Sequence, residues 1–142
     1  MSSAPLPSPD MDHRARHDIT WASAGSDHFT GDVEFGPMRP PEAPDALAVV
    51  GVRFSPGARS DWHHHPAGQV LFVVDGTALV QNDRGDSVSV GPGGIVYAPA
   101  GEVHWHGAGP EEPLIHLSIT DGGPTEWLGR KVSDEEYRSA LG

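Results

Sequence analysis

Histidines stand at alternate positions in two short segments of this sequence, and imidazoles placed in this way are suited to bind a metal ion. The first segment holds His63 and His65, and the second, further along the chain, holds His104 and His106. Side chains two residues apart in a strand point to the same face, so each pair would present its ring nitrogens together. Gln69 follows the first pair beyond a bend marked by proline and glycine, where the chain can turn back and add a side-chain oxygen. Imidazole nitrogens with one neutral oxygen suit a divalent first-row metal.

A further histidine bears on this hypothesis. His116 lies in an apolar run in which Leu114, His116 and Ser118 share one strand face. If that face borders the metal, a neutral imidazole there is suited to act as a general base. The alternative for His116 is a buried histidine that is hydrogen-bonded to backbone and has no catalytic role. The alternative for each of the remaining histidines is a solvated surface position in an acidic protein. The paired spacing, rather than any one histidine, favours the metal site.

The composition limits the classes of protein that could carry such a site. The chain has 142 residues and a mass of 15.0 kDa, which suits one domain. It has no cysteine, which excludes disulfides, thiolate chemistry, zinc fingers and iron–sulfur clusters. The net charge of −11 argues against nucleic acid or an anionic membrane as partner. No apolar run is long enough to span a membrane, and the lack of a secretory signal predicts a cytoplasmic protein.

The segments that must position the histidines are short β-prone runs separated by turns. The 18 glycines and 14 prolines argue against a helical bundle. The runs between residues 47 and 120 predict an antiparallel sandwich or barrel. Asp75–Gly76 and Arg84–Gly85 are expected to form hairpin turns within it.

The segment before the barrel is less regular. Residues 1–18 are rich in serine, proline and charge, which predicts a disordered arm and leaves residues 19–142 as one domain. Short strands are expected at residues 19–21 and 32–35, unless this segment pairs with another subunit. Residues 38–44 form a proline-rich connector that cannot be helical.

One short helix is predicted near the C-terminus. Ser133 and Glu136 have the spacing of a capping box, in which each residue satisfies a backbone N–H of the other. Tyr137 and Leu141 follow four residues apart and are expected to dock one face of the helix onto the barrel.

The spacing of these residues resembles the two sequence motifs of the cupin superfamily. The residues that match are Gly57, His63, His65, Gln69 and Gly76 in the first motif and Gly93, Pro99, Gly101 and His104 in the second. The resemblance implies an all-β fold with a single cupin barrel, a jelly roll or double-stranded β-helix, and a short C-terminal helix. It also implies that His63, His65, Gln69 and His104 bind one divalent metal ion. Cupins commonly pair through strands, which implies a homodimer or homotetramer.

Residues 29–137 resemble, in particular, a subgroup of small bacterial cupins that includes the manganese-dependent hydroxynitrile lyases. This resemblance implies a small cyanohydrin substrate and manganese, with iron, nickel or zinc as alternatives. His116, twelve positions after His104, corresponds to the histidine that assists proton transfer, with His106 as a second participant. Thr120 stands where the lyases have glutamine, so a donor to the substrate is shortened. Gln69 replaces the usual cupin glutamate, and its neutral amide leaves more positive charge on the metal, which favours Lewis-acid chemistry.

The sequence leaves three hypotheses for the substrate and the class of reaction. The first hypothesis is the hydroxynitrile lyase. The second is a cupin dioxygenase, or another metal-dependent lyase or isomerase, that acts on an enol or a small organic acid. The third is a non-catalytic barrel that binds a small ligand. Oxygen uptake by iron-loaded protein would identify the dioxygenase, and a lack of turnover would identify the binding module. Candidates to line the pocket are Val50, Val52, Phe72 and Leu117.

Overall fold

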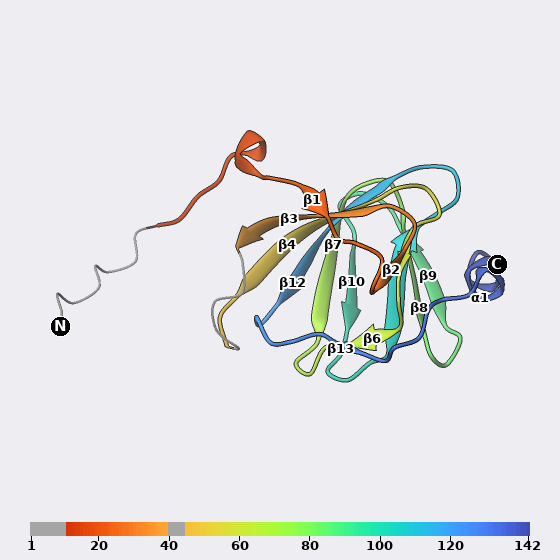
Figure 1. Ribbon diagram of the computed structural model, residues 1–142. Coiled ribbons are helices and arrows are strands. Elements are labelled where there is room, and N and C mark those ends of the chain that lie inside the picture. The colour runs from red at the N-terminus through yellow and green to blue at the C-terminus, as the bar shows by residue number, and fades with distance from the viewer. Residues whose placement is uncertain (1–10, 40–44) are drawn as a thin grey trace.

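The β-prone runs of the sequence form two antiparallel sheets that face each other (Figure 1), in a computed structural model that describes residues 11–39 and 45–142. The first sheet contains, in spatial order, β1 (Ala22–Ser23), β3 (Val33–Arg39), β4 (Ala48–Phe54), β12 (Leu114–Thr120), β7 (Gln69–Asp75) and β10 (Ile95–Ala98). The second sheet contains β13 (Glu126–Trp127), β6 (His63–His64), β11 (His104–Ala108), β5 (Arg59–Ser60) and β2 (Phe29–Thr30), with β8 (Ala78–Asn82) on β11 and β9 (Ser87–Val90) on β8. The predicted all-β architecture is confirmed.

The main core lies between the two sheets and follows from the alternation of side chains along each strand. Val52 and Phe54 on β4, and Leu71 and Val73 on β7, point inward and are almost fully buried. Leu114 on β12 joins them and is fully buried. Burial of each such side chain stabilises the fold by about 1.5–3 kcal/mol relative to exposure.

A second core lies between the other face of the second sheet and helix α1 (Asp134–Ala140). The predicted capping box is confirmed: the Glu136 amide donates to Ser133 Oγ over 3.0 Å, and the Ser133 amide donates to the Glu136 carboxylate. Tyr137 is buried, and its hydroxyl donates to a backbone carbonyl of β11. The expected docking of Leu141 is wrong, because Leu141 is 44% exposed and Ala140 is the second buried residue of the helix.

The two predicted hairpin turns have different outcomes. Arg84–Gly85 joins β8 and β9, which pair as a hairpin, so that prediction is confirmed. Asp75–Gly76 is not a hairpin turn, because β7 belongs to the first sheet and β8 to the second. Gly76 has a φ of 79°, and a Cβ there would collide with the Pro113 carbonyl oxygen, so the crossing between sheets requires glycine.

The segment before the barrel also departs from prediction. Residues 19–21 are not a strand; β1 begins at Ala22 and pairs with β3. β3 continues beyond the predicted 32–35 through Pro37, where it has a strand neighbour on only one side, the position in which a sheet tolerates proline. Residues 40–44 of the predicted connector and 1–10 of the predicted arm lie outside the described residues.

The remaining arm residues, Met11–Asp18, are exposed, and Arg16–Asp18 form the 3-10 turn η1. Among the described residues, no helix has both the length and the apolar character that a membrane crossing requires.

Candidate metal centre

Three imidazoles from the second sheet meet inside the barrel. His63 on β6 lies directly opposite His104 on β11 in the strand register, and His106 follows on the same face of β11. All three side chains are buried, and one ligand atom of each lies within 4.8 Å of the others. These three histidines could therefore hold a metal ion.

Backbone carbonyls fix the orientation of two of these rings. His63 Nδ1 lies 2.8 Å from the Asp61 carbonyl oxygen, and His104 Nδ1 lies 2.8 Å from the Glu102 carbonyl oxygen. A carbonyl oxygen only accepts, so Nδ1 is the donor in both rings. Because a neutral imidazole carries one N–H, Nε2 of each ring bears a lone pair. Each Nε2 is thus prepared to bind a cation.

Gln69, the first residue of β7, aims its amide oxygen at the same place. Its nitrogen donates to Ser118 Oγ over 2.7 Å, so its Oε1 faces His104 Nε2 at 2.9 Å. Both atoms offer lone pairs, and such a contact is repulsive unless a proton or a cation lies between them. Burial lowers the pKa of His104, which opposes the proton. This pair of buried acceptors fits a divalent metal ion.

His65 lies beside this group but not within the tightest set. Its ring centroid is 5.2 Å from that of His63 and 6.1 Å from that of His104. Its Nε2 is buried without a hydrogen-bond partner among the described residues. Burial, with the neighbouring His104, lowers the pKa of His65 to about 4. The ring is therefore neutral at pH 7 and keeps an unused nitrogen inside the barrel.

His106, one of the three clustered histidines, is also hydrogen-bonded to His116. His106 Nδ1 and His116 Nε2 are 2.9 Å apart, so one of them donates to the other. His106 Nε2 has no partner among the described residues, and His106 borders the pocket. His116 is completely buried, which lowers its pKa to about 3. Burial also lowers the pKa of His106 and of His63 well below the usual value, so the cluster is uncharged at pH 7.

An apolar pocket of about 280 Å³ opens above these groups. Its lining consists of Phe29, Phe35, Pro37, Ala48, Val50, Val52, His63, His65, Gln69, His106, Ser118, Thr120, Gly123, Thr125 and Trp127. The expectations for Val50 and Val52 are therefore confirmed. Those for Phe72 and Leu117 are wrong, because both side chains lie on the outer face of the first sheet. The ring of Phe29 meets that of Trp127 edge to face, with centroids 5.8 Å apart.

The pocket wall is held in place by Lys131, the only lysine of the sequence. Its ammonium donates to the Ser26 carbonyl over 2.7 Å and to the Phe29 carbonyl over 3.3 Å. It also lies 3.3 Å from the carboxylate of Asp61, whose side chain is only 4% exposed. Asp61 supplies the carbonyl that orients His63, so this lysine clamp joins the aromatic wall to the candidate metal ligands.

No sequence pattern marked Ser118 or the aromatic wall as functional. Strand alternation places Ser118 on the inward face of β12 with His116, and the structure adds its contact with the Gln69 amide. Phe29 and Trp127 come from β2 and β13, two-residue strands far apart in the chain. Their meeting depends on the tertiary pairing of the second sheet, which local patterns do not encode.

The chain is similar to proteins of one barrel family. Residues 51–120 match the cupin domain. The (R)-mandelonitrile lyase of Granulicella tundricola is 42% identical over 118 residues, which cover 80% of this chain and 88% of that protein. A cupin-like protein of Thermotoga maritima is 38% identical, with a TM-score of 0.78 over 93% of this chain and 97% of its own. The polyketide cyclase RemF of Streptomyces resistomycificus has a TM-score of 0.72 at 20% identity, over 91% of this chain and 92% of its own, and shows the fold alone.

The two sheets around a buried histidine cluster thus define a barrel with a candidate metal site. The chain belongs to the cupin family, and the predicted jelly-roll fold is confirmed.

Proposed function

We propose that the protein is a metal-dependent carbon–carbon lyase that cleaves a small cyanohydrin into an aldehyde and hydrogen cyanide. The observation that carries this proposal is a set of neutral imidazole and amide donors on the floor of an apolar pocket. The 42% identity to a protein named as an (R)-mandelonitrile lyase supports the choice of reaction.

His63, His65, Gln69 and His104 are the proposed ligands of the ion. The facing acceptors of Gln69 and His104 and the unused nitrogen of His65 support this set. His106 lies near enough to join it, but its contact with His116 favours a role in proton transfer. Bound there, a divalent ion, manganese by preference and otherwise iron, nickel or zinc, supplies Lewis acidity toward a substrate oxygen.

The chain's own groups handle the proton. His106 Nε2 takes the proton of the substrate hydroxyl, and His116 Nε2, 2.9 Å from His106 Nδ1, accepts a hydrogen bond from that nitrogen, which orients the ring and stabilises its transient positive charge. The C–O bond becomes a carbonyl as the bond to the cyano carbon breaks, and its electron pair leaves as cyanide. The Thr120 hydroxyl accepts from the Gly122 amide at 3.3 Å, which leaves its own proton free to donate to the cyano group. Return of the held proton to cyanide completes hydrogen cyanide.

The pocket favours a small substrate with an apolar side group. Its volume of about 280 Å³ is at the lower end for ligand sites. Phe29 and Trp127 offer ring edges and faces against which an aryl or short alkyl group packs. The expected substrate is therefore an aromatic or short aliphatic cyanohydrin.

The test combines metal analysis with a mandelonitrile cleavage assay on protein expressed with each candidate metal. Activity should follow manganese content, and His116→Ala should lower the rate by about 10²–10⁴-fold at unchanged metal content. His17→Ala, on the exposed arm, is the matched histidine control and should change nothing. Unchanged activity in His116→Ala would remove this residue from the mechanism. Oxygen uptake by the iron form, or no turnover with any metal, would replace the lyase by a dioxygenase or a binding barrel.

A further inference from the structure

One histidine outside the metal centre, His28, lies flat against the aromatic wall of the pocket. Its ring is parallel to that of Trp127, with an angle of 5° between the planes and 4.1 Å between the centroids. Among the described residues, neither ring nitrogen of His28 makes a hydrogen bond or an ion pair, and neither is buried. No polar contact of the imidazole therefore explains its position, and its stacking on the indole does.

The backbone around His28 is fixed by contacts that do not involve its side chain. The His28 carbonyl accepts from the Asp61 amide over 2.9 Å. Lys131 donates to the carbonyls of Asp27 and Phe29, the residues on either side of His28. A substitution of the His28 side chain leaves all of these contacts in place, so the loss of the ring can be tested separately from the loss of the anchor.

Trp127 needs support from another ring because its own strand is short. β13 has two residues and, among the described strands, pairs only with β6. The indole borders the pocket beside the metal centre, with its ring centroid 4.9 Å from that of His63, and Phe29 meets it edge to face. A ring that covers one face of the indole thus limits how far the indole can turn away from the pocket.

We propose that His28 is a positioning residue, which holds the Trp127 indole in the orientation that receives an aryl group of the substrate. This inference rests on the proposed cleavage of a cyanohydrin and deepens it. An aryl group gains from a ring held in place, since aromatic pairs depend on the angle and offset of the two rings. A short alkyl group gains little from this order, because burial of apolar surface has no preferred direction. His28 therefore sets the preference of the pocket for aromatic over aliphatic substrates.

The kinetics of two manganese-loaded variants, His28→Ala and His28→Phe, test the proposal. His28→Ala should raise KM for mandelonitrile by about 3–10-fold at unchanged kcat, because the stacked rings contribute to binding and not to proton transfer. KM for the cyanohydrin of propanal should stay close to its wild-type value. His28→Phe keeps a flat ring without the nitrogens and should restore the wild-type values for both substrates.

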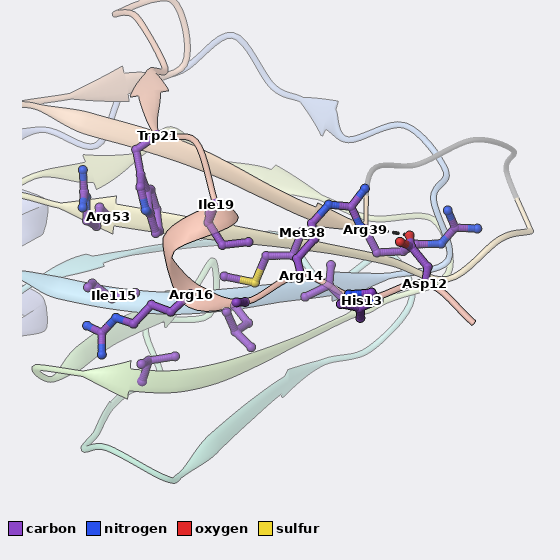
Figure 2. Close-up of a pocket in the computed structure, with 14 residues that line it drawn as sticks. Asp12, His13, Arg14, Arg16, Ile19, Trp21, Met38, Arg39, Arg53 and Ile115 are labelled. Atoms are coloured by element: carbon purple, nitrogen blue, oxygen red, sulfur yellow. Dashed lines mark hydrogen bonds and ion pairs between the residues drawn. The ribbon is translucent and has the colours of Figure 1, made fainter. Parts of the chain in front are cut away.

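Two controls separate this role from a general effect on the structure. Metal content should be equal in all variants, because the Asp61 carbonyl orients the His63 ring independently of Trp127. His13→Ala is the matched histidine control and should change neither KM. His13 lies on the arm, in a groove over the outer face of the first sheet that shares no lining residue with the pocket (Figure 2).

Binding of benzyl alcohol, which has no cyano group to lose, tests the inference without turnover. NMR titration should show an affinity that is about 3–10-fold lower in His28→Ala and unchanged in His28→Phe. This result would uphold the role of His28 even if the wild-type protein cleaved no cyanohydrin.

Three results with the variants would overturn the proposal: equal losses for the aryl and alkyl substrates, loss of metal from His28→Ala, or a failure of His28→Phe to restore KM. Wild-type protein that does not bind benzyl alcohol would overturn it as well.

Discussion

The candidate ligands owe their readiness to bind a cation to contacts made by the other atoms of the same side chains. The carbonyls of Asp61 and Glu102, each two residues before a histidine, accept from Nδ1 and leave Nε2 as the free acceptor. Ser118 Oγ accepts from the amide nitrogen of Gln69 and so leaves the Gln69 amide oxygen as the free acceptor. Partners that orient the ligands in this way commonly matter nearly as much as the ligands themselves.

The Ser118 contact gives a direct test of whether Gln69 binds the ion. Ser118→Ala removes the acceptor of the Gln69 amide nitrogen, so the amide can rotate its oxygen away from His104. Metal affinity, measured by competition with a chelator, should fall by about 10–100-fold. Ser89→Ala, at an exposed position on β9, serves as control. Equal affinity in both variants would contradict a ligand role for Gln69.

Among the strands, the alternation of side chains between the two faces determines which residues reach the metal centre and the pocket. The motif spacing places His63 and His104 in the strands that the structure pairs. Side chains alternate between the two faces of a strand. Gln69 faces inward, so Phe72, three residues later, must face outward. In the same way Leu117, the neighbour of the inward-facing His116, must face outward. Strand alternation alone therefore places both side chains outside the pocket.

Other features were beyond local patterns. The connection of β7 to β8 between sheets, rather than through a hairpin, depends on the pairing of β8 with β11. The clamp of Lys131 on backbone carbonyls around residue 26 joins positions 105 residues apart in the chain. A lone lysine in a sequence carries no sign of such contacts.

We expect the loss of Lys131 to lower the free energy of unfolding more than the loss of an ordinary exposed lysine would. Lys131→Met removes the donor to several carbonyls and leaves the buried Asp61 carboxylate without its counter-ion. Because the lysine side chain is 50% exposed, we expect a discounted cost of about 1–3 kcal/mol in the free energy of unfolding.

Urea denaturation measures this cost. Arg84→Met removes a cation that is 63% exposed, whose partners are Asp86 at the surface and the less exposed Glu102, and it should cost about 1 kcal/mol or less. Equal costs for the two variants would show that the clamp adds nothing beyond a surface ion pair.

For the whole molecule, the buried imidazoles make stability depend on pH. The folded chain holds the pKa of His65 at about 4 and that of His116 at about 3, whereas an unfolded chain has values near 6.5. Between these values the unfolded chain binds more protons, so the free energy of unfolding decreases as the pH falls below about 6.5. Each such histidine contributes up to about 1.4 kcal/mol per pH unit.

Calorimetry of chelator-treated protein at pH 8.5, 7.5, 6.5 and 5.5 checks this prediction. The melting temperature should be nearly constant between the two highest values and then fall. A flat profile down to pH 5.5 would mean that the imidazoles become protonated within the folded barrel.

The lysine clamp also constrains how the protein can be handled in the laboratory. Amine-directed reagents, such as succinimidyl-ester dyes or aldehyde-activated resins, will find a single lysine side chain, and it is the one that fastens the aromatic wall to the Asp61 carboxylate. Attachment there would loosen the site that the experimenter wishes to observe. Labelling or immobilisation is better directed to a cysteine introduced at the tip of the β8–β9 hairpin, in a chain that has no cysteine of its own.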